Sequence, residues 1–338
     1  MPNLGKLLSI FLVLGPAISR AQDPHFSQFF ASPLTLNPAY TGFFNGDMRV
    51  AANYRSQWSS ISTPFITGTV SADMDILKNV INPNDVFGVG IMALYDQTGG
   101  GGLLENYVGV STAYHKALDV NGQQTLGLGV QVTLVQKRLD FSKLVFENQL
   151  GTEGFDPSIP SGETFTNTNI TYSDYNVGML YNATIQDNSN VYFGASYYHI
   201  TQPQESFLGE NNRIHSRISI HGGGAFPINP TTNFYASGLF MKQGGATETD
   251  FGGAFGLVVD NDPVAPTVFF AGSWFRWNDA LSPYVGLETK GFRVGLTYDV
   301  NISGLSAASN YRGGIELSVI YLKPPANPTG KRLHCPEF

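Results

Sequence analysis

Polar and apolar residues alternate along several segments of this chain with a period of two. The clearest segment begins at position 47, where a polar set alternates with an apolar set: Asp47, Arg49, Asn53, Arg55 and Gln57 against Met48, Val50, Ala52, Tyr54 and Trp58. Successive side chains of a β-strand point to opposite faces of the sheet, so the pattern predicts a strand with one polar and one apolar face. Segments 126–134 and 292–301 alternate in the same way.

Similar segments recur from about position 47 to position 322. Each is followed by a cluster of turn residues, and no sustained helical periodicity interrupts them. We count fourteen predicted strands, which start near the following residues: Asp47, Phe65, Asp85, Leu103, Gln123, Ile170, Asn190, Arg213, Thr231, Thr249, Thr267, Leu281, Gly291 and Tyr311.

The composition favours a membrane-embedded sheet over a soluble one. Charged residues make up 13% of the 338 residues, where about 25% is usual in soluble proteins. Aromatic residues also make up 13%, yet the mean hydropathy is only −0.06. A sheet with one apolar and one polar face has this composition, and a transmembrane β-barrel is such a sheet. A soluble β-sandwich or β-helix would alternate similarly, but the low charge and the strand lengths favour the barrel.

The connections fit an all-β, 14-stranded antiparallel transmembrane β-barrel whose strands begin on the periplasmic side. Barrels of this class have short periplasmic turns and longer outer loops. The longest predicted connections, 139–169, 202–212 and 302–310, all fall on the outer side. Trp58 and Trp277 are placed near the outer ends of strands, where an aromatic girdle is expected.

Four regions follow from this division. Residues 1–21 are interpreted as a signal peptide, because Lys6 precedes a short apolar stretch and the small residues Ser19 and Ala21 precede the cleavage site. Residues 22–46 form a predicted periplasmic or plug segment, 47–322 the outer-membrane barrel, and 323–338 a periplasmic tail. Both termini are thus expected in the periplasm. Cys335 is the single cysteine, so it has no internal disulfide partner.

No catalytic or cofactor-binding motif is recognisable, so we expect no enzyme, no cofactor and no metal. The net charge of −7 and the absence of a basic cluster exclude nucleic acid as a partner. His215, Arg217, Ser219 and His221 alternate along one strand, as a lumen metal or proton site would require. Two histidines six residues apart are roughly 20 Å apart on a strand, so polar lumen lining is the favoured interpretation.

Two further groups of residues carry candidate chemistry. Asp73 and Asp75 share a face and are expected to line the lumen beside Arg49 and Arg55 of the neighbouring strand, rather than to perform acid–base catalysis. The long loop 139–169 is acidic and aromatic, which makes it a candidate docking surface. Its candidate residues are Phe146, Glu147, Phe155 and Asp156.

Three motifs near the N-terminus are more specific than any of these patterns. They are Gln22-Asp23-Pro24-His25-Phe26-Ser27-Gln28-Phe29, then Leu36-Asn37-Pro38-Ala39-Tyr40-Thr41-Gly42, then Asn53-Tyr54-Arg55-Ser56-Gln57-Trp58. Their order resembles the PorP/SprF family of type IX secretion system membrane proteins. The ending Cys335-Pro336 is similar to the family's Cys-Pro ending, although Glu337 stands where Arg is common. The signature positions are Asp23, Pro24, Phe26, Gln28, Phe29, Asn37, Pro38, Thr41, Gly42, Arg49, Tyr54, Arg55, Gln57 and Trp58.

The resemblance implies a non-enzymatic barrel of gliding or surface-secreting bacteria. Family members help to export or anchor cargo proteins, such as adhesins, that carry a C-terminal sorting domain. Expected partners are that cargo, other type IX secretion components and outer-membrane lipid. A passive porin or transporter remains the alternative, and the sequence leaves open whether the lumen is open or blocked by the N-terminal segment.

Overall fold

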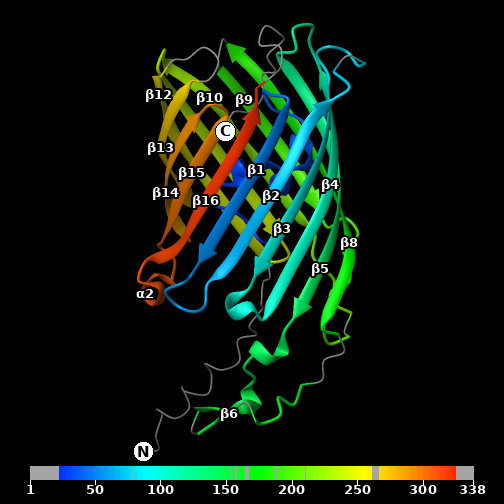
Figure 1. Ribbon diagram of the computed structural model, residues 1–338, viewed down its shortest axis with the longest axis vertical. Helices are drawn as coiled ribbons and strands as arrows, with labels where there is room; N and C mark the ends of the chain where they lie inside the picture. Colours follow the sequence, from blue (N-terminus) through cyan, green and yellow to red (C-terminus); the bar gives the residue numbers. More distant parts are fainter. Residues whose placement is uncertain are drawn as a thin grey trace, which may run out of the picture.

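The computed structural model describes residues 23–78, 80–152, 154–156, 158–163, 167–186, 189–209, 211–260 and 266–324. Within this part of the chain, fourteen antiparallel strands form one closed barrel, in which β1 pairs with β16 to complete the ring (Figure 1). The expected fold is therefore confirmed. The signal peptide and Cys335 lie outside the described residues.

The barrel strands follow one another around the ring in chain order. Their bounds are β1 Met48–Gln57, β2 Phe65–Ile76, β3 Val86–Gln97, β4 Leu103–Ala117, β5 Gln124–Leu139, β8 Asn169–Gln186, β9 Ser189–Tyr198, β10 Arg217–Asn229, β11 Thr232–Gln243, β12 Ala246–Asp260, β13 Thr267–Arg276, β14 Ala280–Thr289, β15 Phe292–Asn301 and β16 Arg312–Lys323. A two-stranded hairpin, β6 Leu150–Gly151 and β7 Gly154–Phe155, lies in the loop between β5 and β8.

Two of the predicted strand starts are displaced. β10 begins at Arg217 and not near Arg213, because Arg213 belongs to the preceding loop, where it bridges to Gln204. β12 begins at Ala246 and not near Thr249, because a tight turn with Gly244 at φ +55° joins it to β11. Only glycine adopts such a conformation without strain.

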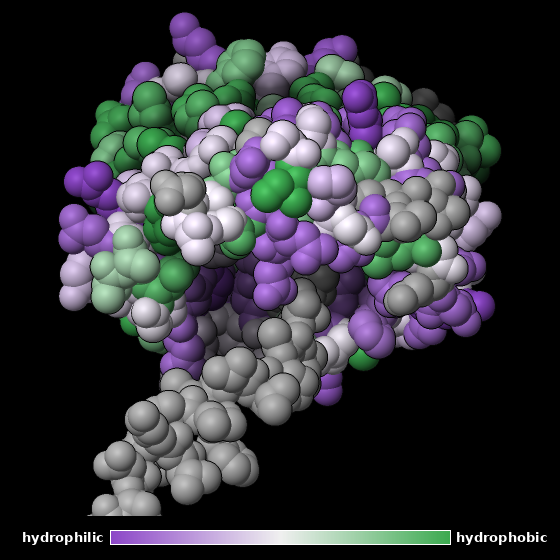
Figure 2. Space-filling model, turned by 90° about the horizontal axis from the view of Figure 1, so that it is seen from below, coloured by the Kyte–Doolittle hydropathy of each residue, from purple (hydrophilic) through white to green (hydrophobic). Residues whose placement is uncertain are grey.

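The alternation in the sequence becomes two faces of the barrel wall. Along β5, Leu128, Val130, Val132 and Leu134 point outward with exposed fractions of 42–61%. Gln131, Thr133 and Lys137 point into the lumen and are buried. Large apolar side chains exposed in this number indicate contact with lipid. Figure 2 looks at the end that carries the long loop: hydrophilic residues surround a hollowed mouth, and hydrophobic residues gather mainly along the upper part of the outline.

The two ends of the barrel differ in their connections. The loops 58–64, 98–102, 140–168, 199–216 and 302–311 leave one end, called here the long-loop end. The other end, called the short-turn end, carries the connections that follow the even-numbered strands of the ring and the points where β1 begins and β16 finishes. Trp58 and Trp277 directly follow β1 and β13 at the long-loop end, where a girdle was expected.

Residues 23–46 lie inside the barrel and cross it from one end to the other. Asp23 contacts the last residue of β11, Gln243, at the long-loop end. Gly46 approaches Lys323 at the short-turn end. Between them the chain makes three short helical turns, η2 Phe29–Ala31, α1 Pro33–Leu36 and η3 Pro38–Tyr40. No helix in the described ranges is long and apolar enough to span a bilayer.

This path bears on the expected positions of the two ends of the chain. Asp23 lies at the long-loop end, whereas β16 finishes at the short-turn end. The expectation that both termini are periplasmic stays a prediction, but the first and last described residues lie at opposite mouths of the barrel. The reason is the threading of residues 23–46 through the lumen, which alternation along the strands does not encode.

Candidate functional site: the filled lumen and the long-loop end

The first anchor of the N-terminal segment is a charged latch at the long-loop end. One carboxylate oxygen of Asp23 lies 2.7 Å from Nε2 of His199 and 3.1 Å from Nη1 of Arg217. The amide of Gln243 donates to the other oxygen at 2.9 Å. Nδ1 of His199 faces the buried carboxylate of Asp174 at 3.1 Å. His199 thus joins the segment to the end of β9, in a setting where charge-assisted contacts are strong.

The contact between Asp23 and His199 should weaken at high pH. Burial alone would lower the pKa of His199, but the carboxylates of Asp23 and Asp174 raise it to about 9. Burial opposes ionisation of Asp23, yet Arg217 and His199 hold its pKa below the usual range. The His199 contribution is complete below its unfolded pKa near 6.5 and is lost as the pH rises through about 9. The Asp23 contribution is complete above about pH 4 and is lost only in strong acid.

We therefore expect the start of the segment to open more readily at pH 10 than at pH 6, by on the order of 2–3 kcal/mol. Hydrogen exchange of the backbone amides of residues 23–26, corrected for the intrinsic pH dependence, measures this difference. A His199→Gln variant is the control, because it should show no step between these two values. Equal protection at both values in the wild-type protein would contradict the prediction.

The second anchor is a buried network around Asp299. The carboxylate of Asp299 accepts hydrogen bonds from Arg55 at 2.9 Å, Arg276 at 2.8 Å and the Ser27 hydroxyl at 2.8 Å. The backbone N–H groups of Ser27 and Gln28 donate to Glu316, each at 2.8 Å. Strands far apart in the sequence are thus tied to the same turn of the N-terminal segment.

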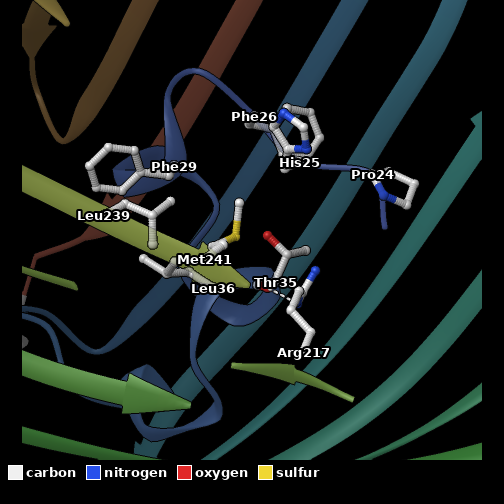
Figure 3. Close-up of a pocket in the computed structure, with 9 residues that line it drawn as sticks. All are labelled: Pro24, His25, Phe26, Phe29, Thr35, Leu36, Arg217, Leu239 and Met241. Atoms are coloured by element: carbon white, nitrogen blue, oxygen red, sulfur yellow. Dashed lines mark hydrogen bonds between the residues drawn. The ribbon is translucent and has the colours of Figure 1, made fainter. Parts of the chain in front are cut away.

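Little space remains around this part of the segment. His25 pairs with Glu248 at 2.8 Å. A cavity of about 20 Å³ lies beside Phe26 and Phe29 and is closed on the barrel side by Leu239 and Met241 (Figure 3). That volume holds roughly one water molecule.

Apolar and aromatic contacts join the segment to β13 and β14. The ring of Phe30 lies 4.7 Å from that of Trp274 and 5.6 Å from that of Tyr284, measured between ring centroids. Both wall residues are almost fully buried. Such aromatic groups contribute roughly 0.5–1.5 kcal/mol per pair beyond the area that they bury.

The middle of the segment passes over two glycines in the wall. Gly129 of β5 and Gly178 of β8 are directly paired across the two strands. A Cβ atom at Gly178 would lie 1.8 Å from Oδ1 of Asn37, and one at Gly129 would lie 2.5 Å from the Ala39 nitrogen. The absent side chains let Asn37 donate to the carbonyl of Met179 at 2.9 Å and reach His221 at 3.1 Å.

Filling this space should displace the segment. We expect Gly178→Val to destabilise the protein by roughly 1–3 kcal/mol, the usual range for overpacking. Gly68→Val in β2 is the matched control, because the nearest atom to a Cβ there is 3.8 Å away. Chemical unfolding of both variants in phospholipid vesicles measures the difference. Equal loss of stability would show that Gly178 does not receive Asn37.

The segment ends against a third anchor near the short-turn end. The carboxylate of Asp73 accepts from Arg49 at 2.8 Å and from the backbone N–H of Gly42 at 2.8 Å. The Cα atom of Gly88 lies 2.4 Å from the position that a Cβ at Gly42 would take, and Gly42 has φ +73°. Only glycine satisfies both conditions. Phe43 stacks on the buried ring of His115 with centroids 4.2 Å apart.

Most of the signature residues meet in these anchors. Asp23, Gln28, Asn37, Thr41 and Arg49 all lie in the lumen. Three signature residues lie outside these contacts: Tyr54 points outward at 46% exposure, and Gln57 and Trp58 are half-buried at the end of β1. The pairing of Arg49 with Asp73 agrees with the expectation.

Two expectations from the strand pattern are wrong in part. Arg55 lies near the long-loop end and bonds Asp299, not Asp73 or Asp75, because six residues of β1 separate it from Arg49. His215 precedes β10 in an exposed loop, so it does not share a face with His221. Among the described residues, no group of three His, Cys, Asp or Glu side chains could hold a metal ion.

Sequence reasoning missed the residues that receive the segment. These are Asp174, His199, Gln243, Arg276, Asp299 and Glu316. Their only signal is that each is a polar or charged residue at or near an inward position of a strand, which holds for many lumen residues. The sequence pattern predicted Arg217 only as one of four residues that alternate along a strand with His215 and His221.

The candidate docking residues lie beyond the barrel at the long-loop end. Glu147, Phe155 and Asp156 are exposed, and Phe146 is half-buried. Gln149 holds this loop together. Its backbone carbonyl accepts from Asp156 N at 2.9 Å, and its side-chain amide donates to Ile159 O at 2.9 Å. The loop therefore presents exposed apolar side chains: Leu150 at 58% and Phe155 at 46% exposure on the hairpin, and Val145 at 59% before it.

Comparisons with known proteins agree with this picture. A sequence model described as type IX secretion system membrane protein PorP/SprF matches residues 18–321. None of the curated proteins compared with the chain matches it. The Ralstonia pickettii toluene transporter TbuX is similar in structure at 13% identity and a TM-score of 0.52, over 90% of this chain and 95% of the transporter. A Pseudomonas aeruginosa FadL homologue is similar at 12% identity and a TM-score of 0.45, over 84% and 92% of the two chains.

Proposed function

The chain belongs to the PorP/SprF family of type IX secretion system membrane proteins, and from this premise we propose that it is a non-enzymatic accessory barrel that binds cargo at its long-loop end. The cargo is an adhesin-like protein with a C-terminal sorting domain, which the barrel helps to export or to retain at the cell surface. The long-loop end then faces the outside and the short-turn end faces the periplasm, as in other barrels of this class.

The filled lumen is the observation that carries this proposal. Ser27, Gln28, Asn37 and Thr41 are 0–2% exposed inside the barrel, and their segment is bonded to strands around the whole ring. A lumen that is occupied by the chain's own residues has no path for cargo. Binding is therefore assigned to the surface and not to the interior.

The long loop supplies that surface. Exposed apolar side chains that gather on one ordered element are typical of protein interaction sites. Leu150 and Phe155 pair with each other across the small hairpin and are both exposed. The acidic residues Glu147 and Asp156 stand beside them, which favours a partner surface with basic and apolar groups.

The rival function is a passive porin or transporter. It requires a continuous aqueous path, which residues 23–46 obstruct in the described structure. The likeness to TbuX concerns the fold alone. Conductance of the full-length protein in planar bilayers separates the two functions, since the proposed function predicts a closed barrel.

The surface and secreted proteome of a clean deletion strain tests the proposal. Loss of one or a few sorting-domain proteins, with the others exported normally, supports a dedicated cargo partner. Loss of all type IX cargo indicates a core part of the machine. An unchanged proteome overturns the secretion function.

The docking surface is tested in the same strain by complementation. A Leu150→Ser, Phe155→Ser double variant should reduce surface display of the cargo, while barrel assembly stays normal. Leu305→Ser is the matched control, because Leu305 is 38% exposed in another loop at the same end. Equal surface display of the cargo with the wild type, the double variant and Leu305→Ser would show that the hairpin does not bind cargo.

A further inference from the structure

β8 extends well beyond its neighbour β9 at the long-loop end. β8 has 18 residues and β9 has 10. β5 pairs with β8 as far as Asn169, whereas the ladder between β8 and β9 stops at Val177 and Tyr197. The part of β8 that precedes Val177 therefore has a strand on one side only, within the described part of the chain (Figure 1).

The direction of the backbone groups along this part of β8 is fixed by two hydrogen bonds. Leu139 N donates to Thr168 O at 2.9 Å on the β5 side, and Ile200 N donates to Tyr175 O at 3.1 Å on the opposite side. Backbone groups of alternate residues in an antiparallel strand point to opposite sides. The N–H and C=O groups of Asn169, Thr171 and Ser173 thus point away from β5, and no described residue pairs with them.

The loop after β9, residues 199–216, does not pair with this edge because its residues His199 and Glu205 bind groups in the lumen. His199 and Gln202 have φ values of +57° and +46°, which are unusual for residues other than glycine. His199 is held there by Asp23 and Asp174. Further along, Glu205 reaches the lumen-facing Lys137 at 3.0 Å. The Tyr172 hydroxyl of β8 donates to Glu205 at 3.5 Å. The loop's next backbone bond on this side is at Phe207, whose carbonyl accepts from Asn167 N, just before β8, at 3.2 Å.

The open edge lacks the features that normally prevent strand pairing. Proteins guard free edges with proline, with outward charges or with bulges. Asn169, Thr171 and Ser173 have uncharged, exposed side chains, and no proline lies between them. Within residues 169–174 of β8 itself, the one charged residue, Asp174, points into the lumen. The irregularity in the β8–β9 pairing lies at the other end of the strand, between Thr184 and Gln186.

We propose that this edge of β8, residues 169–173, binds an extended segment of the cargo protein by strand addition. The inference rests on the proposed cargo-binding function and names the contact. An extended strand is the occupant because unpaired backbone groups in this spacing are complementary to another strand. The edge begins directly after the acidic long loop. The described positions of 140–163 hold one basic residue, Lys143, and four acidic residues: Asp140, Glu147, Asp156 and Glu163. The cargo strand is therefore expected to be flanked by basic residues.

Backbone substitution tests the contact without disturbing the barrel ladder. Thr171→Pro removes an N–H group that points away from β5, so the β5–β8 pairing keeps its hydrogen bonds. The probe is the recombinant C-terminal sorting domain of the protein whose surface display is lost in the deletion strain. We expect Thr171→Pro in the full-length purified barrel to bind it about tenfold more weakly, which corresponds to one or two lost hydrogen bonds. Thr171→Val keeps the N–H group and should bind like the wild type.

A second variant covers the case in which the proline prevents folding. Thr171→Lys keeps the backbone and introduces the kind of charge that guards natural edges, so it should also weaken binding. Hydrogen exchange gives an independent readout. The amides of Thr171 and Ser173 should exchange rapidly in the free barrel and slowly with the sorting domain bound, whereas those of Ile170 and Tyr172 should be protected in both states.

The outcomes separate this inference from the function on which it rests. Binding that survives both Thr171→Pro and Thr171→Lys, without new protection at Thr171 and Ser173, overturns strand addition and leaves cargo binding in place. If the wild-type barrel binds no sorting domain, the proposed function fails and the inference fails with it. Weakened binding together with new protection supports both.

Discussion

Deletion of residues 23–40 is expected to convert a closed barrel into an ion-conducting pore. These residues fill the lumen from the long-loop end to its middle, with Ser27, Leu34 and Asn37 no more than 2% exposed. Barrels of 8 strands are filled by their own side chains, and those of 16–18 strands leave an aqueous channel. A 14-stranded barrel whose inward positions include Gly129 and Gly178 should be wide enough to conduct once the segment is gone.

Single-channel recording in planar bilayers measures this change. The full-length protein should show no steady conductance, and the deletion variant should show stable open levels. A variant that lacks residues 141–157 of the long loop is the control, since it loses a similar length outside the lumen and should stay closed. Steady conductance of the full-length protein would favour the porin function, and a silent but folded deletion variant would show that other residues close the lumen.

The wall of this barrel was predictable because its physics is local. A strand buried on one side by lipid and on the other by a polar interior must alternate, and segments such as 126–134 show that alternation directly. The displaced starts of β10 and β12 come from loop features that do not change the periodicity: a bridge at Arg213 and a tight turn at Gly244. Register and faces were unaffected by either.

The interior was not predictable in the same way, because its contacts join distant parts of the chain. Asp23 and Gln243 are 220 residues apart, and Gln28 and Glu316 are 288 residues apart. Nothing in the neighbourhood of Glu316 distinguishes it from another inward polar residue. The motifs identified Asp23, Asn37 and Arg55 as members of a recurring pattern, but only the fold shows what they bind.

The direction of the N-terminal segment is the clearest example of this limit. Its three prolines and short helical turns are consistent with either direction of threading. The direction is set by polar contacts with the wall: the carboxylate of Asp23 meets His199 and Arg217 at one end. At the other end, Gly42 N donates to Asp73 and Tyr40 O accepts from Arg49. The residue pattern of a single strand does not show which distant residue each of its side chains contacts.

Asp299, the centre of the second anchor, should be the position at which substitution lowers the free energy of unfolding most. Asp299 accepts from Arg55, Arg276, Ser27 and Ser282 at 2.7–2.9 Å and is 3% exposed. We expect Asp299→Ala to lower the free energy of unfolding by about 3–5 kcal/mol, because it leaves two buried guanidinium groups without their shared carboxylate. Guanidinium titration in phospholipid vesicles, followed by tryptophan fluorescence, measures the loss.

An exposed ion pair provides the matched control for this prediction. Asp47 pairs with Lys78 at 3.0 Å, with side chains 27% and 40% exposed, so Asp47→Ala should change stability by about 0–1 kcal/mol. The link to the N-terminal segment is tested by combining Asp299→Asn with Ser27→Ala. Because Ser27 belongs to the segment and Asp299 to the wall, the two effects should be non-additive. Simple additivity would mean that Asp299 stabilises the wall alone, and that the segment is held in the lumen by its other anchors.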